Sequence, residues 1–326
     1  MQMRLLEVKD LRTYFKLEDK TIYAVSGVSF TIDEKEVVAL IGESGSGKSV
    51  TALSIMGLVP QPPGIIESGI IEFQGEDLLK KKEKEMRSIR GNKLAMVYQE
   101  PMNSLNPSLT VGYQIKECLT IHKKAKGEEA KKMAIEMLRK VEMADPESIY
   151  DSYPHKLSGG MRQRIMIAMA LICNPKLLIA DEPTTALDVT IQAEILDLIK
   201  RLKDEIGTSV LLITHDLGVV TEMADKIIVM YGGKIMEIAS TNALYSNPSH
   251  PYTIGLMKCI PRMNKTKEKL YTIEGAVPDM SFLAAGCEFY DRCEKKTQIC
   301  KENTPELLEI EENHFVRCFL YTQGVK

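Results

Sequence analysis

Residues 42 to 49 read Gly42-Glu43-Ser44-Gly45-Ser46-Gly47-Lys48-Ser49, which fits the phosphate-loop pattern Gly-x-x-x-x-Gly-Lys-Ser. Residues 36–41 before it form a short apolar run of strand type, so a strand leads directly into the loop. Glycines lack a Cβ atom, which lets backbone N–H groups approach phosphate oxygens. The alternative is a glycine turn with a chance lysine and serine. The context of strand, loop and helix favours a nucleotide site.

Lys48 and Ser49 end this motif with side chains suited to a triphosphate. We expect Lys48 to reach the β- and γ-phosphates and the Ser49 hydroxyl to ligate Mg²⁺. A helix predicted to begin near Ser49 would point its positive end at the anion. The predicted nucleotide contacts here are Gly42, Glu43, Ser44, Gly45, Ser46, Gly47, Lys48, Ser49 and Val50.

A second glycine element, Leu157-Ser158-Gly159-Gly160-Met161, precedes an apolar pattern of helical spacing over residues 162–171. Ser158, Gly159 and Gly160 would form the amino end of that helix. Small residues there leave backbone N–H groups open to a γ-phosphate.

Two acids follow a continuously apolar run at residues 177–180, which is typical of a parallel strand buried on both faces. At the end of such a strand, Asp181 can hold Mg²⁺ through water and Glu182 can polarise an attacking water. Taken alone, two adjacent acids after an apolar strand also fit an ordinary solvated turn.

Gln99 and His215 complete the polar candidates. His215 ends a second apolar run, residues 209–215, where ligands of open parallel sheets gather. Gln99 precedes Glu-Pro in residues 97–101, and its amide could coordinate Mg²⁺. Each residue also fits an ordinary structural role.

In this order the motifs resemble those of ATPases of the ABC class, over most of the chain. The resemblance implies that Asp181 is the metal-associated aspartate, Glu182 the general base, His215 the switch histidine that contacts the γ-phosphate, and Gln99 the Q-loop glutamine. Residues 183–188 resemble the D-loop between subunits. Met161 stands where glutamine is frequent, which leaves phosphate binding intact.

The same resemblance implies a partner. Two ATPase subunits, identical or related, would pack head to tail, with the phosphate loop of one facing the signature of the other. Phe15 follows the strand-like residues 5–11, where the family carries the aromatic that stacks on adenine. Tyr14 and Tyr23 are alternatives, as is a surface aromatic without a ligand.

Composition predicts several structural units and no membrane span. The chain has 326 residues, 44% of them hydrophobic, and a formal net charge of −3, which disfavours nucleic acid as the principal partner. No apolar run approaches the roughly 18 residues of a spanning helix, and the charged amino terminus does not read as a secretory signal. Membrane association would therefore come from a partner.

The predicted fold class is α/β, a P-loop core of the ABC type with an antiparallel β subdomain. Residues 1–245 would form the nucleotide-binding domain, with a helical subdomain at about 102–168, and residues 246–326 a small cysteine-rich extension. A helix is expected over 190–206, stopped by Gly207, and a hairpin at Gly232-Gly233. In residues 127–143 helical spacing predicts that Met133, Met137 and Leu138 lie inside.

The extension narrows the family. Residues 247–253, 259–262 and 286–293 resemble a tail peculiar to ATPases of dipeptide and oligopeptide importers. That resemblance implies a peripheral subunit on the cytoplasmic face of the membrane, two permease subunits that contact residues 103–113, and an extracytoplasmic substrate-binding protein.

Four of the seven cysteines lie in this tail: Cys287, Cys293, Cys300 and Cys318. Disulfides would need an oxidising compartment, and zinc usually takes paired Cys-x-x-Cys knuckles, which are missing. Four cysteines of varied spacing also bind iron–sulfur clusters. The resemblance favours a [4Fe–4S] cluster of structural role, with zinc as the alternative.

Other functions stay open. The cargo could be nickel chelates or oligosaccharides, because the ATPase does not contact cargo. A soluble ABC protein that acts on DNA or ribosomes would carry two cassettes or a coiled coil, and neither is apparent. A P-loop kinase would have no use for residues 157–161.

Overall fold

The computed structural model describes residues 3–99, 104–185, 187–259, 271–281 and 285–322. Backbone contacts divide the chain into two compact units. Unit 1 comprises Met1–Leu5, Ile32–Val37 and Lys80–Ile213, and unit 2 comprises Leu6–Thr31, Val38–Leu79 and Thr214–Lys326. The expected domain boundary near residue 245 stays a prediction. Of the sequence motifs, residues 100–103, Ala186 and 260–262 lie outside the described residues.

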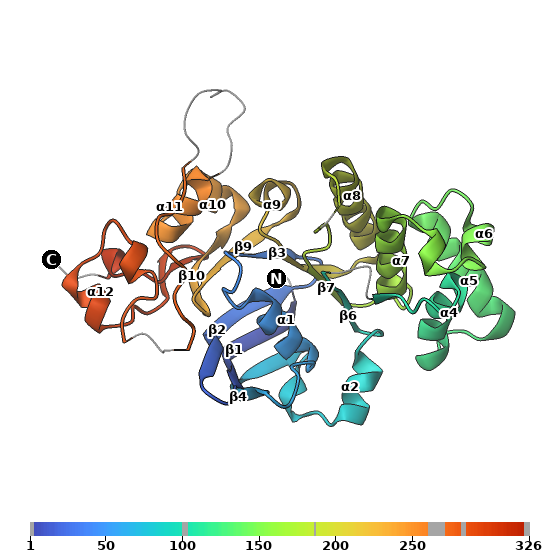
Figure 1. The fold of residues 1–326 in the computed structure, drawn as a ribbon, viewed down its shortest axis with the longest axis horizontal. Coiled ribbons are helices and arrows are strands. Elements are labelled where there is room, and N and C mark those ends of the chain that lie inside the picture. Colours follow the sequence, from blue (N-terminus) through green and yellow to red (C-terminus); the bar gives the residue numbers. More distant parts are fainter. Residues whose placement is uncertain (1–2, 100–103, 186, 260–270, 282–284, 323–326) are drawn as a thin grey trace. The chain divides into compact units, whose positions relative to one another are not determined.

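Unit 1 holds three parallel strands in the order β8-β7-β6, of which β6 and β7 are labelled in Figure 1. These are β6 (Leu94–Val97), β7 (Leu177–Asp181) and β8 (Ser209–Ile213). Every residue of β7 and β8 is buried, as the apolar runs predict for parallel strands covered on both faces.

The helices of unit 1 include α4, α5, α6 and α7, which gather in one group in Figure 1. In α5 the buried side chains recur at helical spacing, at Ala130, Ala134, Met137 and Leu138. Met133 is only half-buried, because its position falls at the edge of this apolar face. Over its described residues, unit 1 contains α2 (Glu83–Ile89), α4 (Val111–Ile121), α5 (Gly127–Lys140), α6 (Pro146–Tyr150), α7 (Gly159–Leu171) and α8 (Val189–Ile206).

Unit 2 holds the predicted antiparallel sheet, in the order β2-β1-β4-β5. Strand β1 pairs with β4 from Leu6 opposite Phe73 to Phe15 opposite Gly64. The strands are β1 (Arg4–Lys16), β2 (Thr21–Asp33), β4 (Gly64–Phe73) and β5 (Glu76–Asp77).

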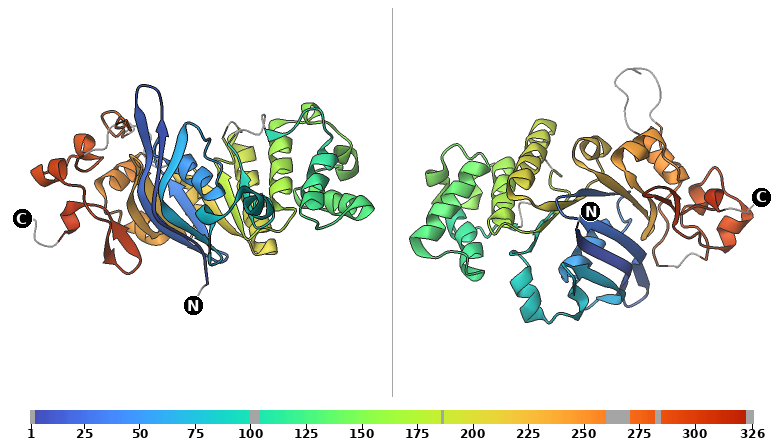
Figure 2. Two further views of the ribbon diagram at one scale, coloured as in Figure 1. Left: turned by 90° about the horizontal axis from the view of Figure 1, so that it is seen from below. Right: turned by 180° about the vertical axis from the view of Figure 1, so that it is seen from behind.

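A second group of strands in unit 2 follows the order β11-β12-β10-β9-β3. Strand β3 runs parallel to β9, and the other pairs are antiparallel. The extension therefore adds two strands, β12 beside β10 and β11 beside β12, which the sequence patterns did not predict. Figure 2 shows the ribbon from two further sides, with the end of the extension in red. The strands are β3 (Val37–Ile41), β9 (Lys226–Tyr231), β10 (Lys234–Ser240), β11 (Leu308–Glu311) and β12 (His314–Val316).

Two predicted glycine signals are confirmed. Helix α8 ends at Ile206, and Gly207 has a left-handed φ of 76°. The β9-β10 hairpin turns at Gly232 and Gly233, with φ of 55° and 75°, as a two-residue turn with two positive φ angles requires.

The described helices of unit 2 are α1 (Lys48–Met56), α9 (Leu217–Met223), α10 (Thr241–Ser246), α11 (Pro251–Lys258) and α12 (Gln298–Glu302). Short 3-10 helices lie at Leu78–Lys80, Tyr290–Arg292 and Phe319–Tyr321, and another lies in unit 1 at Pro154–Lys156.

Candidate nucleotide-binding site

The phosphate loop joins strand β3 to helix α1 within unit 2. Gly42, Gly45 and Gly47 have φ of 151°, 79° and 100°, a region that other residues rarely adopt. A Cβ atom at Gly42 would lie 2.1 Å from the Met230 carbonyl oxygen, and one at Gly47 would lie 2.2 Å from the Ala24 carbonyl oxygen. Space as well as φ therefore requires glycine at Gly42 and Gly47.

Replacing Gly42 by alanine should lower both the unfolding temperature and the affinity for ATP, because the new Cβ must displace backbone. Gly45→Ala is the matched control, since nothing lies within 4 Å of its Cβ position and only the cost of φ remains, about 1 kcal/mol. Thermal unfolding and calorimetric titration with ATP measure both effects. Equal unfolding temperatures for the two variants would refute the steric explanation.

Lys48 closes the loop on itself. Its Nζ donates to the carbonyl oxygens of Gly42 at 2.8 Å and Glu43 at 2.9 Å, and the residue is 6% exposed. Ser44 and Gly45 at the tip are exposed. The loop thus ends at a buried ammonium group and at the N-terminus of helix α1, and both groups attract an anion.

Two residues of the extension contact this loop at Glu43, and sequence reasoning missed both. The Glu43 N–H donates to the Tyr252 hydroxyl at 2.9 Å, and Arg292 Nη1 lies 2.9 Å from Glu43 Oε2. The residues are separated by 209 and 249 positions, so no local pattern could have indicated these contacts.

Unit 1 brings together Gln99 and Glu182. Gln99 Nε2 donates to Glu182 Oε2 at 2.9 Å, and the Thr185 hydroxyl donates to the same oxygen at 2.8 Å. Asp181, the last residue of β7, is 6% exposed. Two carboxylates, one amide and one hydroxyl therefore stand together at the carboxyl end of a buried strand.

Glu182 has a strained backbone. Its φ is 45°, uncommon for a residue other than glycine, and its N–H donates to the Ile213 carbonyl oxygen at 2.8 Å. Such strain persists only where the surroundings enforce it, and it is concentrated at functional sites. The Glu182 carboxylate accepts from Gln99 in this conformation.

The signature lies at the start of helix α7, also in unit 1. Ser158 is its N-cap and accepts from the Met161 N–H at 3.3 Å. Gly159 is exposed and Gly160 half-buried, and a Cβ at Gly160 would lie 3.0 Å from Ile191 Cγ2. The helix therefore begins with small residues, as predicted.

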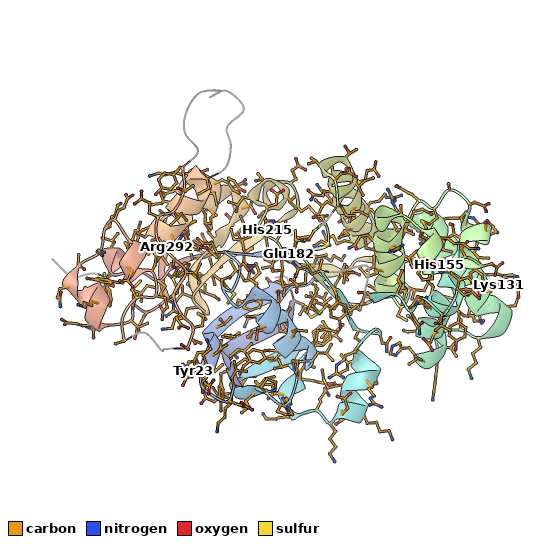
Figure 3. The ribbon with its side chains drawn as sticks, in the orientation of Figure 1. Tyr23, Lys131, His155, Glu182, His215 and Arg292 are labelled. Carbon is orange, nitrogen blue, oxygen red and sulfur yellow. The ribbon has the colours of Figure 1, made fainter. Side chains whose placement is uncertain are left out.

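His215 belongs to unit 2, as does the phosphate loop, whereas Gln99, Asp181, Glu182 and the signature belong to unit 1. His215 is exposed and stands two residues after β8 ends (Figure 3). Asp216 beside it caps helix α9 by accepting from the Gly218 N–H at 2.8 Å.

Phe15 lies within strand β1 rather than after it. The strand continues to Lys16 because a register shift after Lys9 absorbs Asp10, whose φ is positive. Phe15 is half-buried opposite Gly64, and the rings of Tyr14 and Tyr23 lie 6.0 Å apart. Stacking on adenine stays a prediction for Phe15.

The four tail cysteines line one cavity of about 120 Å³ in unit 2. The cavity also contacts His250 and Phe289, and the thiols are free. Burial raises the pKa of Cys287 to about 12 and that of Cys318 to about 11, and it also raises the pKa of Cys293. These thiols stay protonated at neutral pH unless a cation stabilises their thiolates.

Comparisons with known proteins agree with these features. Residues 25–185 match the family model described as ABC transporter, and residues 236–300 match the model of the oligopeptide/dipeptide transporter C-terminal region. The chain is 53% identical over 319 residues to the oligopeptide transport ATP-binding protein AppD of Bacillus subtilis, covering 98% of this chain and 97% of that protein. The chain belongs to the ATP-binding proteins of the oligopeptide/dipeptide ABC transporter family.

Further relatives support the family and its ATPase activity. The dipeptide transport ATP-binding protein DppD of Bacillus subtilis is 47% identical over 320 residues, covering 98% of this chain and 96% of that protein. The solved ATP-binding cassette MJ0796, a dimer bound to ADP and Pi, is 31% identical with a TM-score of 0.65, covering 72% of this chain and 98% of that chain. The predicted fold of an ABC ATPase is thereby confirmed.

The two family models cover different predicted site residues. The family's ABC transporter model includes Lys48, Gln99 and Glu182, and its C-terminal model includes three of the tail cysteines but ends before Cys318. Within the described ranges, no helix has the length and apolar character needed to cross a bilayer.

Proposed function

We propose that this chain hydrolyses ATP to power the import of di- or oligopeptides through a membrane permease. One observation carries the proposal: the similarity to proteins named for oligopeptide and dipeptide transport extends through 98% of the chain, extension included. Nickel chelates and oligosaccharides are the alternative cargoes.

The phosphate loop binds the triphosphate in this proposal. Lys48 and the backbone N–H groups of residues 42–50 neutralise the phosphate oxygens, and Phe15 stacks on adenine. Support comes from the glycine-dependent conformation of the loop and from the buried Lys48 ammonium group.

Ser49, Gln99 and Asp181 would hold Mg²⁺. Their hydroxyl, amide and carboxylate oxygens are the hard ligands that this ion prefers, and Asp181 is 6% exposed at the end of β7. The ion, when bound, supplies positive charge beside the phosphates.

Glu182 orients the attacking water as general base, and His215 contacts the γ-phosphate. The hydrogen bonds from Gln99 and Thr185 to Glu182 Oε2 fix the orientation of this carboxylate, as a general base requires. Gln99 therefore links the state of the general base to the Q-loop, whose neighbouring residues 103–113 would face the permease.

A second ATPase subunit, related or identical, completes the site. We propose that Ser158, Gly159 and Gly160 of one subunit bind the γ-phosphate held by the phosphate loop of the other, and that residues 183–188 line the contact. The exposed start of helix α7 and the likeness to a dimeric cassette support this.

The complete system would contain two integral-membrane permease subunits and an extracytoplasmic substrate-binding protein, with this chain peripheral on the cytoplasmic face. The test is uptake by proteoliposomes that contain the chain with its permease, using labelled peptide, a nickel chelate and an oligosaccharide. ATP-dependent uptake of peptide alone supports the proposal. Uptake of another cargo in preference to peptide contradicts it, as does purification with nucleic acid rather than with membrane subunits.

We further propose that the tail cysteines hold a [4Fe–4S] cluster. The fit rests on Cys287, Cys293, Cys300 and Cys318 lining one cavity. Among the residues that the structure describes, no three thiol, imidazole or carboxylate groups converge tightly enough to hold a single metal ion. Zinc, which takes four thiolates in a tetrahedral site, is the alternative occupant of this cavity.

Replacing Cys293 by serine should abolish the cluster. We expect anaerobically purified protein to contain about four iron and four sulfide per chain with a visible absorption band, and Cys293→Ser to lose most of both. Cys259→Ser is the control, because Cys259 does not line the cavity. Zinc in place of iron, or no metal, would exclude the cluster and leave the ATPase proposal intact.

A further inference from the structure

We propose that the extension positions the phosphate loop, with Arg292 and Tyr252 acting through Glu43 to keep the loop competent for ATP. This inference rests on the proposed function of the loop, and it concerns residues of unit 2 alone. Arg292 and Tyr252 are positioning residues, because their contacts are to the loop.

Arg292 is held as a rigid connector. Its side chain is 6% exposed and pairs with Glu43, whose side chain is 25% exposed. Its other nitrogens donate to the carbonyl oxygens of Ile273 at 3.0 Å and Glu274 at 2.9 Å. A guanidinium group with each nitrogen engaged has one accessible orientation, so the position of Glu43 follows that of the extension.

The absence of a side chain at Gly275 leaves space for the Arg292 side chain. Gly275 has a φ of 87°, and a Cβ atom there would lie 3.0 Å from Arg292 Cγ. The Tyr231 hydroxyl lies 3.2 Å from Arg292 Nη1, and the guanidinium carbon lies 5.6 Å from the Tyr231 ring centre. The pair therefore joins a buried guanidinium group, held by several partners, to a partly exposed carboxylate.

Tyr252 fixes the backbone of the same loop residue. Tyr252 is fully buried, and its hydroxyl accepts from the Glu43 N–H. The centre of its ring lies 4.6 Å from that of the Tyr231 ring and 5.3 Å from that of the Phe289 ring. Burial raises the pKa of Tyr252 well above its usual range, so the hydroxyl stays neutral.

The segment that carries Tyr252 is itself anchored to the sheet. Glu237, fully buried on strand β10, accepts from the N–H groups of Ser249 and His250 at 2.8 Å each and lies 2.8 Å from His314 Nε2. His250 Nδ1 then accepts from the Tyr252 N–H at 3.0 Å. A continuous set of hydrogen bonds thus joins strands β10 and β12 to the phosphate loop.

Electrostatics explains why Glu43 needs Arg292. Glu43 places a carboxylate within a loop that must receive several negative charges. Arg292 neutralises this carboxylate and fixes its position. The next residue in the sequence, Cys293, lines the cysteine cavity. Without Arg292, Glu43 would repel the triphosphate.

The test is equilibrium binding of MgATP to the purified full chain by calorimetry. We expect Arg292→Gln to raise the Kd roughly tenfold, as one uncompensated charge near a protein surface would, with a smaller rise at 0.5 M salt. In the double variant Arg292→Gln with Glu43→Gln, the Kd should return to that of Glu43→Gln alone, because the repelling carboxylate is gone.

Arg317→Gln is the matched control. Arg317 is another arginine of the extension that donates to backbone carbonyl oxygens, those of Ile235 and Pro305, and it precedes Cys318. We expect this variant to lower the unfolding temperature without changing the Kd. An unchanged Kd in Arg292→Gln, equal losses of affinity in Arg317→Gln, or no rescue by Glu43→Gln would overturn the inference.

Tyr252→Phe gives an independent measurement if Arg292→Gln does not fold. It keeps the ring contacts and removes only the acceptor of the Glu43 N–H, so the Kd should rise a few-fold. An unchanged Kd in this variant would also count against the inference. Failure of the wild-type chain to bind ATP would instead refute the proposed function itself, so the two failures are distinguishable.

Discussion

Replacing Glu182 by glutamine is expected to lower ATP turnover about 100-fold to 10,000-fold, while the affinity for ATP persists and closed dimers accumulate. The amide has the shape of the carboxylate and keeps an oxygen that accepts from Gln99 and Thr185, so the local structure survives. What is lost is the negative charge that polarises water. Phosphate release measures turnover, and size-exclusion chromatography with ATP measures dimers.

Glu194→Gln is a suitable control, since it removes the same charge from helix α8. Glu194 is 48% exposed and pairs with Arg164 on helix α7. Its turnover should match that of the wild type. Unaltered turnover in Glu182→Gln would remove Glu182 from the role of general base.

Replacing Lys48 by methionine is expected to weaken ATP binding on the order of 100-fold. The change removes a charge-assisted contact to phosphate, about 1.5–3 kcal/mol, and leaves the Gly42 and Glu43 carbonyl oxygens without the donor that closes the loop. Calorimetric titration with MgATP measures the loss.

Lys9→Met is the control for Lys48→Met, because Lys9 lies on strand β1 with 51% of its side chain exposed and pairs with the nearby Glu7. We expect no change in its Kd. If Lys48→Met bound ATP as tightly as Lys9→Met, the loop would not be the phosphate site.

Local signals predicted the parts of the fold that depend on local chemistry. The phosphate loop was predictable because its backbone needs positive φ angles, which glycine adopts and few other residues do. Helix α8 and the β9-β10 hairpin were predictable because Gly207, Gly232 and Gly233 mark their ends with positive φ angles.

Features that depend on distant partners were not predictable. Strands β11 and β12 are short, and their conformation depends on the pairing of β12 with β10 and of β11 with β12, which leaves little pattern in the sequence. Glu182, whose φ is positive, donates its N–H to the distant Ile213, and the Glu43–Arg292 pair also joins residues far apart in the chain. The first strand was predicted too short, at residues 5–11, and it continues past a register shift to Lys16, so that Phe15 lies within it.

Peptide-coupled ATP hydrolysis is the most direct test of the central claim. Proteoliposomes would contain this chain with its permease, and phosphate release would be measured with and without peptide-loaded binding protein. The wild type should hydrolyse ATP faster when loaded binding protein is present and accumulate peptide, and Glu182→Gln should do neither. An unchanged rate of ATP hydrolysis on addition of loaded binding protein would contradict the claim that this ATPase powers peptide import. Peptide uptake that persists in Glu182→Gln would contradict it as well.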